Sequence, residues 1–403
     1  MGVCFSSSGG GPSGSKSVNS QRRRLSLSQS DAVVNPEASS ARRGLVRQAT
    51  RSNIIDLFPD STRRFSLSGK PADTNQKGFD NKNIEALGGS DIKEYRVGYA
   101  CKKGLKPESP NQDDFFVIGI DDWGVFGVFD GHGPYGHDIS SFCHDALPGV
   151  TWARFALGVE LLVQLLVKDD AFYTQPEKAF TRAFQDTHML CEQANAKGKF
   201  DCSLSGTTAT VVMTRNGTIY CAWVGDSRAV IGTTKSDGKV VAEDLSRDHK
   251  PEREDEKKRI VAQGGQVRKL EGDIPYRVFL KGKLYPGLAM SRSLGDTVGV
   301  SAGVSYEPEI RTRRIDRTRD RFVVLCSDGV WEFITSQKAV DILSRYTAES
   351  VQAAAEALAQ EAWKRWIQEE GNVVDDITVI VVWLGEDESS NGGGKRSHRQ
   401  SLW

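Results

Sequence analysis

The sequence predicts an α+β fold in which antiparallel strands are combined with pairs of helices. Apolar runs of strand length recur and end at turn residues. The clearest case is the Asn-Gly pair at 216–217 between the runs 207–214 and 218–224, because Asn-Gly is the strongest short hairpin signal. Two stretches with helical periodicity, 335–346 and 351–368, follow one another between two later strands. Many hairpins together with helix pairs favour mixed α and β layers over a parallel sheet.

The chain divides into three segments by composition. Residues 1–90 are rich in Ser, Gly and Arg without sustained periodicity, and we expect them to be largely disordered. Strand and helix patterns begin near residue 91 and continue to about 386, which predicts one domain over 91–386. Residues 387–403 are again rich in Ser and Gly, and we expect a flexible tail.

Composition excludes several classes of protein. A hydrophobic content of 38% in 403 residues suffices for a core, and no apolar run approaches the roughly 18 residues of a membrane span. The N-terminus lacks the apolar segment of a secretory signal. Seven cysteines, mostly inside apolar strands, indicate a reducing compartment, and neither a zinc-binding spacing nor a Cys-x₅-Arg phosphatase loop occurs. Nucleic acid is not among the partners that we expect.

The first element of the domain is a hairpin that brings two carboxylates together. The apolar run 125–129 ends at Asp130, and a second apolar run, 115–120, begins directly after two aspartates. Turn residues at 121–122 separate the runs, and a turn centred there places Asp113 directly opposite Asp130 in an antiparallel pair. A buried carboxylate must be paired, hydrogen-bonded or bound to a cation. The hairpin therefore predicts a polar site at its open end.

The elements that follow have recognisable ends. A helix is predicted over 177–197, where Pro176 opens and Gly198 closes the periodic stretch. The second strand of the Asn-Gly hairpin leads into a Gly-Asp-Ser-Arg turn at 225–228. A further helix is predicted over 251–264, with glutamates in its first turns that suit the helix dipole.

Strand-end acids recur twice near the end of the domain. The apolar run 322–326 leads into Ser327-Asp328-Gly329, and Asp375-Asp376 precede the run 377–384. Carboxylates at strand ends suit hard cations with oxygen ligands, such as Mg²⁺ or Mn²⁺. The residues alone thus indicate a divalent-metal site.

Six short motifs in this order resemble those of the metal-dependent protein serine/threonine phosphatases of type 2C. They are Asp130-Gly131-His132-Gly133, Ser205-Gly206-Thr207-Thr208-Ala209, Gly225-Asp226-Ser227-Arg228, Met290-Ser291-Arg292-Ser293-Leu294-Gly295-Asp296, Ser327-Asp328-Gly329 and Asp375-Asp376-Ile377-Thr378. Each string is weak alone, but six in order across the domain are specific. The resemblance implies a central β-sandwich of two antiparallel sheets flanked by helix pairs, with a binuclear metal centre at one end. It does not cover residues 1–90.

The resemblance also implies a ligand for each metal ion. Asp130 would bridge both ions, and the carbonyl of Gly131 would bind one of them. The other ion would be held by Asp328 and Asp375. Asp113 would act through metal-bound water. The cofactors implied are two Mg²⁺ or Mn²⁺ ions, with a weaker third ion shared by Asp226 and Asp328.

The implied reaction is hydrolysis of phosphoserine or phosphothreonine in protein substrates. Two divalent ions about 3.5–4 Å apart lower the pKa of bound water, and the resulting bridging hydroxide would attack phosphorus in line. His132, two residues beyond Asp130, would donate a proton to the departing alkoxide. The alternative for His132 is a histidine that only hydrogen-bonds a metal-binding carboxylate. The alternative for Asp226 is a turn cap with an arginine partner.

The sequence departs from the family pattern where phosphate is bound. Many relatives have an Arg shortly before the first Asp and a Glu immediately before it, whereas this chain has Gln112 there. Lys102, Lys103 and Lys106 are the candidate replacements, although a lysine offers a point charge and not a bidentate fork. For the pair Arg292 and Asp296 we expect a structural ion pair and no role in the site.

The N-terminal arm carries signals of its own. Its first residues fit the N-myristoylation pattern at Gly2, and Cys4 is placed for palmitoylation, although chance alone also produces this pattern. Residues 1–70 contain eleven Lys/Arg and four Asp/Glu, a net charge of +7. Ser26 and Ser66 follow arginine-rich stretches typical of basophilic kinase sites, with an unmodified, solvated tail as the alternative. We therefore expect a phosphatase at the cytoplasmic face of a membrane. The plasma membrane is the membrane that we expect, and part of the protein would be cytosolic.

Two other functions remain open at this point. A catalytically weak module could use the same fold to bind a partner, and a membrane scaffold could act through its basic arm. Loss of one of the main metal acids would have indicated the first, and none is lost. The second leaves the acidic cluster unexplained.

Overall fold

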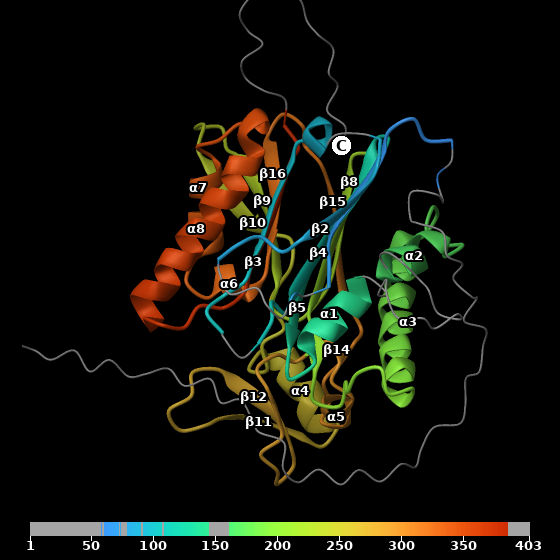
Figure 1. Ribbon diagram of the computed structural model, residues 1–403, viewed down its shortest axis with the longest axis vertical. Helices are drawn as coiled ribbons and strands as arrows, with labels where there is room; N and C mark the ends of the chain where they lie inside the picture. Colours follow the sequence, from blue (N-terminus) through green and yellow to red (C-terminus); the bar gives the residue numbers. More distant parts are fainter. Residues whose placement is uncertain are drawn as a thin grey trace, which may run out of the picture.

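The computed structural model describes residues 58, 60–71, 73, 79–89, 92–106, 109–144 and 161–385. Its centre is a sandwich of two antiparallel sheets with helices on both outer faces (Figure 1). The α+β class predicted from the hairpins and helix pairs is confirmed, and so is the sandwich that the resemblance implies. Within the described residues, no helix combines the length and the apolar character needed to cross a membrane.

The first sheet contains the hairpin predicted to carry the site. Its main path runs in the order β15 (Glu309–Arg314), β8 (Thr218–Val224), β7 (Ala209–Arg215), β5 (Trp123–His132), β4 (Asp113–Ile120), β1 (Arg64–Gly69) and β2 (Ile84–Gly88). Two short strands, β6 (Gly206–Thr207) and β14 (Leu294–Gly295), continue the pairing at the end of β5.

The second sheet supplies the other strand-end acids. Its order is β10 (Val240–Asp244), β9 (Arg228–Thr234), β16 (Asp320–Cys326), β17 (Ile377–Trp383) and β3 (Val97–Lys102). Asp328 follows the end of β16, and Asp375 precedes the start of its antiparallel neighbour β17. The two acids therefore lie at the same end of this sheet.

Three apolar layers hold the sandwich together. Alternate residues of β4 point in opposite directions, so that Phe115 packs between the sheets while Phe116 packs under the helices, and both are fully buried. The outer layer on the first sheet is formed with α1 (Gly136–His144), α2 (Leu161–Lys168) and α3 (Pro176–Ala196). The outer layer on the second sheet is formed with α6 (Asp328–Trp331), α7 (Ser336–Leu343) and α8 (Val351–Glu370). Truncating a buried phenylalanine of β4 to Ala would cost about 3–5 kcal/mol.

A small subdomain lies at one end of the sandwich, at the bottom of Figure 1. It consists of α4 (Glu254–Ala262), α5 (Thr297–Ser301) and the three-stranded sheet of β11 (Gly265–Lys269), β12 (Tyr276–Leu280) and β13 (Pro286–Leu288). A separate apolar cluster around Ile260 and Val278 forms its core. The predicted helix over 251–264 corresponds to α4.

The predicted boundary near residue 91 is too late. Residues 64–69 and 84–88, which composition assigned to a disordered arm, form β1 and β2, and β1 pairs directly with β4. Phe65 and Leu67 of β1 are buried between the sheets, and this burial explains why the segment is ordered. The other predictions for the arm, which concern Gly2, Cys4 and Ser26, lie outside the described residues, as does the predicted tail.

The prediction of a kinase site at Ser66 is wrong for the folded protein. Ser66 lies in the middle of β1, between Leu87 of β2 and Ile118 of β4, and is 1% exposed. A kinase must reach the hydroxyl of its substrate, and a strand paired on both sides does not offer it.

Candidate active site

The hairpin of β4 and β5 has the register predicted from its turn. Asp113 is the pairing partner of Asp130, and the turn residue Asp121 adopts a positive φ of 50°. The side chain of Asp121 accepts hydrogen bonds from the backbone N–H groups of Thr62 and Arg63, both at 3.0 Å. The segment that precedes β1 thus fixes the turn of the hairpin, and the hairpin brings two acids together at its open end.

Five carboxylates gather at this end, and we call them the acid cluster. Burial raises the pKa of Asp130 well above its usual value, and the neighbouring charges of the other members raise it further. The members are Asp113, Asp130, Asp226, Asp328 and Asp375. So many like charges at one buried place require cations, and an all-carboxylate donor set suits Mg²⁺ or Mn²⁺. The residues present therefore fit the metal ions that the resemblance implies.

Asp226, in the turn at 225–228, belongs to the acid cluster. The arginine of this turn, Arg228, makes a bidentate ion pair with Asp248, at 2.7 Å for both contacts. The side chain of Asp226 instead accepts from Lys250 at 2.5 Å. The strongest contact of Arg228 is thus with Asp248, and the contact of Asp226 described here is with a lysine.

Two lysines partly neutralise the acid cluster. Lys250 Nζ contacts Asp226, and Lys106 Nζ contacts Asp375. Burial lowers the pKa of Lys250, but Asp226 and Asp328 outweigh this effect and hold it above its usual value. Sequence analysis missed Lys250, although it lies one residue before the proline that opens the next predicted helix.

Of the three lysines predicted to bind phosphate, only Lys106 lies at the acid cluster. Lys102 pairs with Glu356 of α8 at 2.9 Å, outside the site. Lys103 is 4% exposed and donates to the carbonyl oxygen of Lys106 at 2.8 Å, so it stabilises the loop instead. The structure thus reduces three candidates to one.

Asp113 is oriented by hydroxyl groups from two of the motifs. Ser327 and Thr378 both donate to Asp113 Oδ2 at 2.7 Å, and Asn111 Oδ1 accepts from the backbone N–H of Asp113 at 3.0 Å. Burial raises the pKa of Asp113, and the charge of Asp376 adds to this effect. These two donors fix the orientation of the Asp113 carboxylate. Sequence analysis quoted both hydroxyl residues within motifs but assigned neither a role.

The loop before Asp113 is held by Asp376. Its carboxylate accepts from the backbone N–H of Gly104 at 2.7 Å and from that of Gln112 at 2.8 Å. The side-chain amide of Gln112 in turn donates to the carbonyl oxygen of Gly133 at 2.8 Å. Asp376 therefore closes the loop that carries Lys106 and connects it to the turn after β5.

The C-terminal end of β5 depends on a glycine and a threonine. A Cβ atom on Gly131 would lie 2.3 Å from the carbonyl oxygen of Gly136, so only glycine fits there. Thr208 clamps the neighbouring residue: its Oγ1 accepts from the N–H of Asp130, and its own N–H donates to the Asp130 carbonyl, both at 2.9 Å. The backbone that presents Asp130 and the Gly131 carbonyl is therefore rigidly defined.

His132 pairs with Asp296, contrary to our expectation for Asp296. Its Nε2 lies 2.7 Å from Asp296 Oδ2, which also accepts from Ser293 Oγ at 2.5 Å. Burial lowers the pKa of His132, but Asp296 outweighs it and raises the pKa above its usual value. The expected partner of Asp296, Arg292, binds Glu256 instead, at 2.7 Å. Asp296 is thus a site residue that sequence analysis missed, although it ends a quoted motif.

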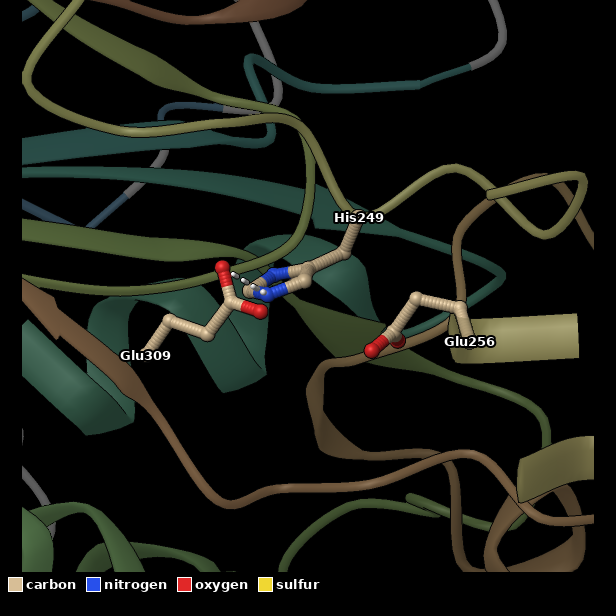
Figure 2. Close-up of side chains that lie close together, drawn as sticks. All are labelled: His249, Glu256 and Glu309. Atoms are coloured by element: carbon tan, nitrogen blue, oxygen red, sulfur yellow. Dashed lines mark ion pairs between the residues drawn. The ribbon is translucent and has the colours of Figure 1, made fainter. Parts of the chain in front are cut away.

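A second cluster of possible metal ligands lies next to the acid cluster. Figure 2 shows His249, Glu256 and Glu309 converging, with ligand atoms within 4.8 Å of one another. His249 Nδ1 accepts from the backbone N–H of Gly225 at 3.1 Å, so the neutral ring carries its proton on Nε2, toward Glu309. That nitrogen is therefore not available as a ligand.

Arginines already satisfy both carboxylates of this second cluster. Glu256 accepts from Arg259 at 2.6 and 2.7 Å and from Arg292 at 2.7 Å, and Arg253 binds Glu309. Burial raises the pKa of Glu256, but these donors outweigh it and bring the pKa to about 2. The second cluster is a charge network that connects α4, β15 and the Gly225 turn, and it does not fit a metal ion.

Comparison with known proteins identifies the same family throughout. Residues 104–370 match the family model described as "Protein phosphatase 2C". "Probable protein phosphatase 2C 35" of Arabidopsis thaliana is 35% identical over 309 residues, which cover 70% of this chain and 82% of the relative. "Probable protein phosphatase 2C 34" of the same plant is 36% identical over 271 residues, covering 66% and 73%.

The solved structures with a similar fold are more distant in sequence. The crystal structure of serine-threonine phosphatase 2C from Toxoplasma gondii has a TM-score of 0.59 at 21% identity, and the match covers 71% of this chain and 94% of that one. A C. elegans sex determining protein has a TM-score of 0.56 at 22% identity, covering 71% and 64%. At these identities the two structures support the fold alone.

Proposed function

This chain belongs to the protein phosphatase 2C family of serine/threonine phosphatases, and we propose that it hydrolyses phosphoserine and phosphothreonine in proteins with Mg²⁺ or Mn²⁺ at the acid cluster. The observation that carries the proposal is the pairing of Asp113 with Asp130 at the open end of the hairpin, where the charges of Asp226, Asp328 and Asp375 lie near enough to raise the pKa of Asp130. Asp130 and the Gly131 carbonyl would hold the ions from the first sheet, and Asp328 and Asp375 from the second. Asp226 would contribute to a third, more weakly held ion, and Asp113 would bind through water.

The ions would supply Lewis-acid chemistry, which activates water for attack on phosphorus at neutral pH. Side chains of the protein would orient the attacking water and protonate the leaving group. Ser327 and Thr378 keep one oxygen of Asp113 occupied, so its other oxygen can orient the attacking water. His132, held by Asp296, would give its proton to the departing serine or threonine oxygen. No covalent enzyme intermediate is needed.

Lys106 is our candidate for the missing phosphate-binding arginine. Its ammonium group reaches the acid cluster from the loop that Asp376 holds. We propose that it moves from Asp375 to the substrate phosphate when metal ions neutralise the carboxylates. A lysine binds phosphate as a point charge, which predicts weaker substrate binding than a bidentate arginine would give.

The test is hydrolysis of a phosphothreonine peptide by the full chain with Mn²⁺, with Mg²⁺ and with chelator. We expect turnover only with metal, and loss of nearly all turnover in Asp130→Asn. The matched control is Asp122→Asn, which changes an exposed aspartate at the other end of the same hairpin and should behave as wild type. Full activity in chelator, or an active Asp130→Asn variant, would refute the proposal.

We further propose that the arm tethers the enzyme to the cytoplasmic face of a membrane. A single myristoyl chain binds membranes only marginally, about 10⁴ M⁻¹, so stable attachment needs a second signal. The sequence offers two such signals beside Gly2: Cys4 for palmitate and a basic arm in which each residue near an anionic leaflet adds roughly 1 kcal/mol. Because Ser66 is buried, phosphorylation of Ser26 is the remaining candidate for weakening this attachment.

A further inference from the structure

A buried lysine that lies outside the residues matching the family model contacts the backbone of Asp113, a member of the acid cluster. Lys82 precedes the segment 104–370 that matches the family model, yet its side chain is only 2% exposed. Its Nζ donates to Asp114 Oδ2 and to the backbone carbonyl of Asp113, both at 2.8 Å. Lysine is almost never fully buried without a partner. The position of this ammonium group therefore needs an explanation.

Lys82 belongs to a short segment, residues 79–84, which we call the strap. The strap crosses from the second sheet to the first. At one end the ring of Phe79 packs on Trp363 of α8, with ring centres 4.0 Å apart, and at the other end the chain enters β2. Between them the N–H of Lys82 donates to the Cys101 carbonyl of β3 at 2.7 Å. The strap is thus anchored on both sides of Lys82.

The carboxylate that receives Lys82 is fully enclosed. Asp114 is 0% exposed and also accepts from Ser141 Oγ of α1 at 2.9 Å, while His144 of the same helix lies 3.4 Å away. Strand β1 covers the pair so closely that a Cβ on Gly69 would lie 2.3 Å from Asp114 Oδ1. Lys82 and His144 are thus the two basic side chains that face Asp114, and the closer of them, at 2.8 Å, comes from the strap.

The same ammonium group completes the fixation of Asp113. The backbone N–H of Asp113 is held by Asn111 and its Oδ2 by two hydroxyls, as described above, and Lys82 holds its carbonyl oxygen. The amide, the carbonyl oxygen and one carboxylate oxygen of Asp113 are thus each held by a defined partner. Groups that orient metal ligands from behind in this way typically change metal affinity or activity 10–100-fold when they are removed.

We propose that Lys82 is a positioning residue of the metal centre, through which the strap holds Asp113 and the start of β4 in the orientation that metal binding requires. This role rests on the proposed function, because it assumes that the acid cluster binds divalent ions. It assigns a catalytic contribution to a segment that composition places in a disordered arm.

The test uses the full chain and two measurements: Mn²⁺ affinity, from the free-ion signal in electron paramagnetic resonance, and the thermal unfolding temperature in chelator. Lys82→Met should unfold at a lower temperature, because it removes the lysine from a buried ion pair and leaves its carboxylate partner, Asp114, in place. It should also bind Mn²⁺ about 10–100-fold more weakly. The double variant Lys82→Met/Asp114→Asn should regain most of the unfolding temperature, because no unpaired charge remains. It should keep the weak Mn²⁺ affinity, because the Asp113 carbonyl still lacks its donor.

The matched control is a second ion pair with a buried carboxylate, between Arg313 of β15 and Asp320. Asp320 begins β16 and thus lies at the opposite end of that strand from Asp328. Arg313→Met/Asp320→Asn should change the unfolding temperature but leave Mn²⁺ affinity unaltered. If Lys82→Met fails to fold, the Mn²⁺ affinity of the double variant still tests whether Lys82 positions the metal centre. A double variant that binds Mn²⁺ as tightly as wild type would overturn the positioning role alone. A wild-type chain that binds no Mn²⁺ would overturn the proposed function and the positioning role together.

Discussion

Glu256 is the residue whose charge should matter most for the stability of the small subdomain. It is 0% exposed and accepts hydrogen bonds from Arg259, Arg292 and Ser291. Although burial alone would raise its pKa, these donors lower it from 4.5 to about 2. At 1.36 kcal/mol per pKa unit, this shift corresponds to about 3 kcal/mol of stability. The figure agrees with the about 3–5 kcal/mol lost when a buried ion pair is broken by removing one partner.

The perturbation is Glu256→Gln, which keeps the shape of the side chain and removes the charge. Because the folded pKa lies below the unfolded one, the stabilisation is fully present above pH 4.5 and is lost as the pH falls toward 2. Urea unfolding in chelator should therefore show a deficit of about 3 kcal/mol at pH 7 that shrinks to less than about half at pH 3.

The matched control for Glu256→Gln lies on the same helix. Glu254 has an 86% exposed side chain and pairs with the exposed Lys258, so Glu254→Gln should cost less than about 1 kcal/mol at either pH. If Glu256→Gln were as stable as this control, the ion pairs of Glu256 with Arg259 and Arg292 would carry no net stability. If its deficit were the same at both pH values, the side chain would act by packing and not by its charge.

Three further predictions concern the site and the arm. Lys106→Ala should raise KM for a phosphopeptide, and Lys106→Arg should not. Lys102→Ala is the control and should leave the kinetics unchanged, because Lys102 lies outside the site. Unaltered kinetics in Lys106→Ala would exclude Lys106 from phosphate binding. Asp296→Asn should lower kcat in the same substrate-dependent way as His132→Ala, by up to about 10²–10⁴-fold for alkyl phosphates and less for phenyl phosphates with good leaving groups; equal losses for both substrates would remove the pair from proton donation. In cell fractionation, Gly2→Ala should be soluble, and a variant that stayed on membranes would end the acylation proposal.

The parts of the site that sequence could predict are those fixed by local geometry. The two apolar runs and the turn between them determine the register of β4 and β5, and so place Asp113 opposite Asp130 without knowledge of the rest of the fold. The approach of Asp328 and Asp375 needs the order of strands in the second sheet, which no local pattern contains. For that step the motif order of a known family was required.

The strand β1 shows why the arm was misjudged. Its sequence, Arg-Phe-Ser-Leu-Ser-Gly, has the alternation of a strand with one buried face, but only Phe65 and Leu67 are apolar. Two apolar residues in a Ser- and Arg-rich context do not stand out from a disordered segment. The ordering comes from long-range contacts, with Phe65 against Tyr95 and β1 against β4, which composition cannot reveal.

The structure explains why a glutamine at position 112, where many relatives have a glutamate, suits this site. The amide of Gln112 donates to the Gly133 carbonyl, a hydrogen bond that an ionised glutamate could not make because it has no proton to donate. A glutamate at this position would also add a negative charge beside a cluster in which Asp113 and Asp130 already have raised pKa values. The chain therefore gains a defined turn after β5 and avoids further repulsion.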